Sequence, residues 1–232
     1  MAGNCIIDDE VCQNAARQEI IRRYYKSLNA LAQGTCPEEE TRKIELLMNQ
    51  AHASVEDRAV VKVSLDLEEK TGAPAAALEL HDGRIVHGKT SDLLGPSAAL
   101  LLNALKALAG IDHDSHLISP QAIEPIQTLK TQYLGSKNPR LHTDETLIAL
   151  SISAASNEKA RAALEQLPNL RGCQAHTSVM LSSVDIQEFM KLSIELTSEP
   201  KYEHKNDLPL IHKFTKTAAD IEILYGCRGL FI

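Results

Sequence analysis

The sequence has no tryptophan and few aromatic residues of any kind. Aromatic side chains make up 3% of the 232 residues, so the core has to be built from leucine, isoleucine, valine and alanine. Proteins that bind single-stranded nucleic acid without sequence preference stack the bases on aromatic rings. A chain with so few rings is a poor match to that class.

Excess positive charge and long apolar runs are also missing. The formal net charge is −7, whereas a surface that coats phosphates is basic. No apolar run reaches the length that a bilayer requires, and the N-terminus lacks the basic-then-apolar layout of a signal peptide. We therefore expect neither nucleic acid nor a membrane as a partner.

Cysteines are few, odd in number and scattered. They stand at positions Cys5, Cys12, Cys36, Cys173 and Cys227. No CxxC pair is present, so the pattern favours free thiols in a reducing cytoplasm. His113 and His116 are spaced as HxxH, and Cys173 and His176 as CxxH, but zinc needs three or four converging ligands. We predict no metal site, and we predict that Cys173 is a buried structural thiol.

The first third of the chain is predicted to be helical. Asp8 stands at a helix start, and the following pattern runs to Gly34. Pro37 is typical of a first helical turn and opens a second helix. A third helix is expected from Ser54 to Lys70. Together these helices predict a helical subdomain over residues 1–72.

Strands and helices alternate over residues 73–203, which predicts an α/β domain around one sheet. Strands are expected at 75–80, 84–88, 116–119, 174–182 and 193–200, and helices at 97–109, 120–135, 144–156 with Thr143 as its cap, 157–168 and 184–192. The tail 204–232 is basic at first and has weak periodicity. It is predicted to be an atypical and poorly ordered segment.

Residues Gly83 to Thr90 match the phosphate-loop pattern GxxxxGK[ST]. In such a loop Lys89 would reach the terminal phosphates and Thr90 would hold magnesium. The four inner residues, however, are bulky and typical of strands. Asp82 and Gly83 form a type I′ turn signal between two strand-like runs. We favour a hairpin, and keep a phosphate-loop enzyme as the alternative.

The helix at 97–109 carries only Asn103 and Lys106 as polar side chains inside it. A helix that is apolar on nearly every side has to be covered on both faces. Its N-terminus would favour an anion, as would a second helix that starts after Ser119. Arg140 and His142 precede a further helix, where they either bind an anion or cap and pair. The predicted ligand-binding residues are Lys89, Thr90, Ser91, Asp92, Ser119, Arg140 and His142.

Several long segments resemble one bacterial family, known as domain of unknown function 1846. The resemblance covers roughly residues 5–203. It rests on IIDDEVCQNAARQEIIRRYY, APAAALELHDGRIVHGKTSDLLG, HLISPQAIEPIQTLK, NPRLHTDETLIALSISAASN, LRGCQAHTSVMLS and LTSEPKY. Members are about twice this long, so the chain resembles their C-terminal half, as a truncated protein. A nucleotide-binding-like N-terminal half is then missing, and the tail after Tyr202 departs from the family.

The resemblance implies a helical subdomain followed by a three-layer α/β/α sandwich whose topology is similar to cytidine deaminase. Zinc deaminases need a His or Cys followed by Glu at one helix start and a Cys pair at the next. Here the two places read Thr90-Ser91-Asp92 and Ser119-Pro120-Gln121. We therefore predict neither zinc nor deamination, and no cofactor other than a nucleotide or phosphate.

Three functions follow as expectations. The first is an accessory module that forms a pocket for a nucleotide or an anionic metabolite together with the missing N-terminal half. The second is the phosphate-loop enzyme. The third is a structural module in which the helix at 97–109 and the N-terminal helices pack against partner subunits as a homo-oligomer. The sequence leaves open whether the chain is an enzyme.

Overall fold

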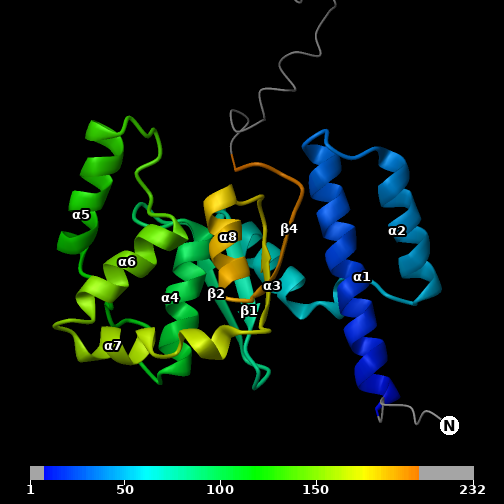
Figure 1. Ribbon diagram of the computed structural model, residues 1–232, viewed down its shortest axis with the longest axis horizontal. Helices are drawn as coiled ribbons and strands as arrows, with labels where there is room; N and C mark the ends of the chain where they lie inside the picture. Colours follow the sequence, from blue (N-terminus) through cyan, green and yellow to red (C-terminus); the bar gives the residue numbers. More distant parts are fainter. Residues whose placement is uncertain (1–7, 204–232) are drawn as a thin grey trace, which may run out of the picture.

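The structure, a computed structural model, describes residues 8–203 of the chain. A small sheet lies in the middle, with α1 and α2 on one side and α5 to α7 on the other (Figure 1). The predicted atypical tail, 204–232, lies outside the described residues.

Two of the N-terminal helices form as the sequence predicts, and the third, predicted from Ser54, is interrupted at Arg58 and begins as an α-helix at Ala59. They are α1 (Asp9–Ala32), α2 (Glu38–Gln50), the short η1 (Val55–Asp57) and α3 (Ala59–Thr71). The Asp8 carboxylate accepts a hydrogen bond from the Val11 N–H at 3.0 Å, which caps α1. Gly72 ends α3 in the left-handed region, at φ 68°.

Four strands make one mixed sheet in the order β2-β1-β3-β4. They are β1 (Ala75–Glu79), β2 (Ile85–Lys89), β3 (Gln174–Thr177) and β4 (Glu195–Ser198). β1 is antiparallel to both of its neighbours, and β3 and β4 are parallel. The prediction of an α/β protein is confirmed.

Helices cover both faces of this sheet. Ala76, Leu78 and Ala175 pack into the main core together with α4. The opposite face meets α1 and α3, where the rings of Tyr25 and His176 lie 4.8 Å apart. Because α3 packs on the sheet itself, the domain boundary at residue 72 stays a prediction.

The β1–β2 hairpin is confirmed, but its turn is not type I′. The Leu80 N–H donates to the Arg84 carbonyl and the Gly83 N–H to the Leu80 carbonyl, each at 2.9 Å. Of the loop residues, only Gly83 has a positive φ, at 81°. This is a three-residue loop, in which a type I turn is followed by a left-handed glycine. Asp82 therefore does not need the left-handed conformation that the prediction assigned to it.

Pairing in β2 also decides against the phosphate loop. Ala76 stands opposite Gly88 and Glu79 opposite Ile85, so the inner residues of the pattern are extended strand. A Cβ on Gly88 would lie 2.3 Å from the Leu100 nitrogen. Gly88 is thus required because β2 touches the backbone of α4, and the alternative function built on a phosphate loop is wrong.

The predicted buried helix is α4 (Pro96–Leu108). Leu100, Leu101 and Leu105 have no exposed surface. They pack against the sheet and against the later helices of the same chain. This helix therefore needs no partner subunit to cover it, which removes the reason for assigning it to an oligomer interface.

The remaining helices follow the predictions less closely. They are α5 (Pro120–Thr128), a π-helical turn η2 (Leu129–Tyr133), α6 (Thr143–Ser153), α7 (Glu158–Leu164), η3 (Leu167–Leu170) and α8 (Ser183–Lys191). The strand predicted at 116–119 does not form. Leu117 and Ile118 are both buried in the core, whereas adjacent strand residues point to opposite faces. The helix predicted over 157–168 breaks after Leu164.

Arg58 ties the N-terminal helices to the sheet. Its side chain is 1% exposed, and burial lowers the pKa of the guanidinium to about 10. It donates to the Ala175 carbonyl at 3.0 Å and also to the Glu195 carbonyl, which lie on β3 and β4. Further acceptors are the side chains of Thr197, Gln174 and Gln18, at 3.1, 2.9 and 3.3 Å.

Candidate functional site

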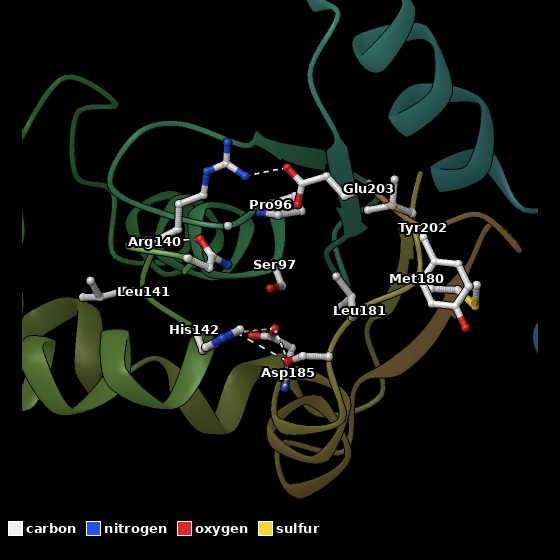
Figure 2. Close-up of a pocket in the computed structure, with 14 residues that line it drawn as sticks. Pro96, Ser97, Arg140, Leu141, His142, Met180, Leu181, Asp185, Tyr202 and Glu203 are labelled. Carbon is white, nitrogen blue, oxygen red and sulfur yellow. Dashed lines mark hydrogen bonds and ion pairs between the residues drawn. The ribbon is translucent and has the colours of Figure 1, made fainter. Parts of the chain in front are cut away.

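Three helices begin around one cavity of about 300 Å³ (Figure 2). Gly95, His142 and Ser182 are the N-caps of α4, α6 and α8, and all three line it. We call it the N-cap pocket. The lining residues that matter below are Gly95, Ser97, Arg140, His142, Ser182, Asp185 and Glu203.

The start of α4 offers unused hydrogen-bond donors. Gly95 has no side chain to cap the helix, and Pro96 has no N–H. Among residues 8–203 no partner is found for the N–H groups of Ser97 and Ala98 or for the Ser97 hydroxyl. Ser97 is 1% exposed, and its side chain lies between Arg140 and Asp185 (Figure 2). Donors placed in this way favour an anion.

Arg140 supplies the positive charge at one end of the pocket. Its own N–H donates to the Asn138 side chain at 3.1 Å, and its carbonyl accepts from the Lys130 ammonium at 2.6 Å. The backbone of Arg140 is therefore fixed from both sides. The guanidinium pairs with the Glu203 carboxylate at 2.5 Å.

Asp185 is the most densely hydrogen-bonded carboxylate of the pocket. It is 5% exposed and accepts from the Thr143 N–H at 2.8 Å, the Thr143 hydroxyl at 2.6 Å and the Ser182 hydroxyl at 2.7 Å. The His142 Nδ1 lies 3.0 Å from Oδ2. Burial alone would raise the pKa of Asp185. The hydrogen bonds from His142, Thr143 and Ser182 outweigh it and hold the pKa far below its usual range.

The contact with Asp185 also changes the acidity of His142. The hydrogen bond to Asp185 raises the pKa of the imidazole, and partial burial opposes this. With Nδ1 on the carboxylate, Nε2 is the nitrogen left to exchange a proton. Ser182 donates to Asp185 and approaches His142 only at Nδ1, 3.4 Å away. The three residues are therefore not a serine-hydrolase triad, in which the hydroxyl bonds to Nε2.

Of the predicted ligand-binding residues, the structure brings Arg140 and His142 together in the N-cap pocket. Thr143, predicted as the cap of its helix, is instead the first helical residue, after His142.

Lys89, Thr90, Ser91 and Asp92 do not stand at the start of α4 as predicted. Lys89 ends β2, and the Ser91 hydroxyl accepts from the Leu93 and Leu94 N–H groups in a turn before the helix. This turn takes up the residues between strand and helix, so α4 begins only at Pro96. Their role in ligand binding stays a prediction.

Ser119 is also separate from the pocket. It caps α5, where its hydroxyl accepts from the Ala122 N–H at 3.3 Å. The strand that was expected to carry it to a shared crevice does not form. It is not among the pocket-lining residues.

Sequence reasoning missed Ser97, Ser182 and Asp185. A local signal existed for the last two, because Ser182 and Asp185 have the spacing of an N-cap serine and an acidic third residue. The contact of Asp185 with His142, 43 residues away, left no such signal. In the part of the chain that the structure covers, no three His, Cys, Asp or Glu residues are grouped as metal ligands. No helix there is both long and apolar enough to span a membrane.

Comparison with known proteins identifies the family. The description "Domain of unknown function DUF1846, C-terminal" matches residues 56–207, and "Domain of unknown function DUF1846, N-terminal" matches residues 1–52. The predicted resemblance is confirmed, but its restriction to the C-terminal half is wrong, since α1 and α2 match the N-terminal description.

Curated relatives give the same result. A UPF0371 protein of Corynebacterium glutamicum (strain R) is 58% identical over 205 residues, which are 88% of this chain and 41% of that protein. A UPF0371 protein of Streptococcus uberis is 49% identical over 204 residues, again 88% and 41%. The chain thus spans less than half the length of these relatives. It belongs to the DUF1846 family.

Proposed function

We propose that the N-cap pocket binds a small phosphate-bearing metabolite and that the His142–Asp185 pair moves a proton on it. One observation carries this proposal. A fixed arginine and the unpaired donors at the start of α4 share one cavity with an acid–base pair.

Several features support an anion at the Arg140 end. Arginine binds phosphate through two parallel N–H groups, and a helix start carries roughly half a positive charge. Arg140 already forms an ion pair with an anionic group of the chain itself, the Glu203 carboxylate. The cavity of about 300 Å³ is at the small end for ligand sites. We therefore favour a small phosphate ester over a whole nucleotide as the ligand of this pocket.

At the opposite end of the N-cap pocket, His142 and Asp185 would supply general acid–base catalysis. Asp185 orients the imidazole of His142 and stabilises its charged form. The raised pKa makes the imidazole a better proton acceptor than an unpaired histidine, and its charged form can return the proton. In this proposal Arg140 and Ser97 hold the phosphate, and His142 Nε2 exchanges a proton with the rest of the ligand.

Calorimetric titration with inorganic phosphate and with small phosphate esters tests the binding step. Wild type is expected to bind, and Arg140→Gln and Ser97→Ala to bind at least tenfold more weakly. Arg42→Gln is the matched control, because Arg42 pairs with Glu38 at the exposed surface of α2. Equal binding by wild type and Arg140→Gln, or no binding by wild type, would refute the proposal.

We also keep two expectations from the sequence as proposals: the cytidine-deaminase-like topology and a pocket shared with a further part of the protein. The strand order β2-β1-β3-β4, with β1 antiparallel to its neighbours, supports a cytidine-deaminase-like topology. The greater length of the relatives supports a pocket that a further part of the family's proteins completes. Full-length relatives should then bind phosphate esters more tightly than this chain, and equal affinity would argue against a shared pocket.

Exposed apolar side chains support a second proposal, that the chain packs against a partner or a second copy. They include Leu129, Tyr133 and Leu134 in and directly after η2, and Ile148 and Ile152 on α6. They are 50–76% exposed, although isoleucine and leucine favour burial. Light scattering of wild type and Ile148→Glu/Ile152→Glu tests this, and a monomeric wild type would count against self-association.

A further inference from the structure

The segment after β4 ends at the N-cap pocket, which Tyr202 and Glu203 line. Glu199 continues the strand pairing, with its N–H on the Thr177 carbonyl at 2.9 Å. The Lys201 carbonyl then accepts from the Met180 N–H at 2.8 Å, and the Lys201 ammonium pairs with Glu68 at 2.6 Å. Beyond this anchor, Glu203 turns toward Arg140 (Figure 2). We call residues 199–203 the strap.

We infer that Glu203 is an internal competitor for the anion site, which a ligand phosphate displaces from Arg140. The inference rests on the proposed function, because it names the group that occupies the site before the ligand arrives. It assigns the strap a regulatory role at the pocket.

The contacts of Glu203 explain why it can be displaced. Its carboxylate accepts from the Arg140 Nη1 and, within residues 8–203, makes no hydrogen bond to Ser97 or to the start of α4. A phosphate group carries more charge and more acceptor oxygens, so it can bind the guanidinium and these unused donors together. The two paired side chains keep 27% and 23% of their surface exposed, so the pair is partly solvated and only moderately strong.

The anchor of the strap limits what has to move. Lys201 is held by Met180 on one side and by Glu68 of α3 on the other. Displacement of Glu203 therefore requires movement only beyond Lys201. The same anchor keeps the carboxylate near Arg140 at a high effective concentration. A ligand carboxylate, with one charge and two acceptor oxygens, therefore competes poorly with Glu203, whereas a phosphate group can displace it.

Calorimetric titration of inorganic phosphate at constant ionic strength tests the competition. The variants are Glu203→Gln, Arg140→Gln and the double variant, and Glu38→Gln on α2 is the control that removes the same charge elsewhere. We expect Glu203→Gln to lower the Kd by about three- to ten-fold. Glu38→Gln should leave the Kd unchanged, and the double variant should bind as weakly as Arg140→Gln alone.

The outcomes separate this inference from the proposed function. If wild type binds phosphate and Glu203→Gln binds it equally or more weakly, Glu203 is not a competitor and the inference fails while the anion site stands. If neither protein binds phosphate, the proposed function fails, and the inference with it. As an independent readout, phosphate should accelerate hydrogen exchange at Tyr202 and Glu203 in wild type, and unchanged exchange would contradict displacement.

Discussion

Replacing Gly88 with alanine tests how β2 rests on α4. The added Cβ would lie 2.3 Å from the Leu100 nitrogen and 2.7 Å from the Ala99 carbonyl carbon. Ordinary contacts of a Cβ begin at 3.4 Å, so strand and helix would have to separate by about 1 Å. Both neighbours are backbone atoms, which cannot rotate away as a side chain would.

The expected cost is large because the contact lies between two packed elements. Overpacking of a core costs about 1–3 kcal/mol, and separation of β2 from α4 also disturbs the hydrogen bonds that β2 makes to β1, at about 1 kcal/mol each. We expect Gly88→Ala to lose about 3 kcal/mol of unfolding free energy. In urea unfolding followed by circular dichroism, this shifts the midpoint down by about 1 M.

The adjacent residue provides the control. Lys89 ends the same strand with an exposed side chain, so Lys89→Ala should change the unfolding free energy by less than about 0.5 kcal/mol. A phosphate loop would give the reverse pattern, with a tolerated glycine substitution and an essential lysine for nucleotide binding. Unfolding of Gly88→Ala at the wild-type urea concentration would refute the close packing of β2 on α4.

Three further predictions concern buried and partly buried polar groups. In Asp185→Asn the pKa of His142 should fall. The measurement is an NMR titration of the imidazole C2–H resonance, which is assigned by its absence in His142→Gln. An unchanged pKa would contradict the pairing. Because folding raises the pKa of His142, its stabilising contribution is full below the unfolded value of about 6.5 and is lost as pH rises through the folded pKa. The unfolding free energy of wild type should therefore exceed that of His142→Gln by more at pH 6 than at pH 8. Arg58→Lys should lower the unfolding free energy, measured by urea unfolding, by about 2–4 kcal/mol, because an ammonium has three donors for the five acceptors that Arg58 reaches. An unfolding midpoint equal to that of wild type would show that these hydrogen bonds contribute little.

Much of the fold was predictable because its signals are local. Capping residues and periodicity placed α1, α2 and α3, and Asp82-Gly83 placed the hairpin. The failures lie where packing overrides local pattern. The apolar residues at 117–118 resemble a strand in sequence, yet they fill the core as irregular chain.

The candidate site was predicted only in part. Arg140 and His142 were identified because a cation and a histidine precede a helix start. The expectation for Lys89 to Asp92 failed because the turn at Ser91 delays the start of α4 until Pro96. Local signals therefore placed His142 correctly at a helix start and placed Lys89 to Asp92 wrongly at the start of α4, while ligand binding at these residues stays a prediction.

The sequence by itself determined most of the helices and strands, the burial of α4, and the hairpin at Gly83 to Thr90, since each depends on neighbours within a few residues. Only the tertiary structure decided that α4, α6 and α8 begin around one cavity. It also brought Asp185 to His142 and Glu203 to Arg140 from 43 and 63 residues away. These long-range contacts depend on how whole helices and strands pack around the shared core, and no short stretch of sequence encodes that geometry.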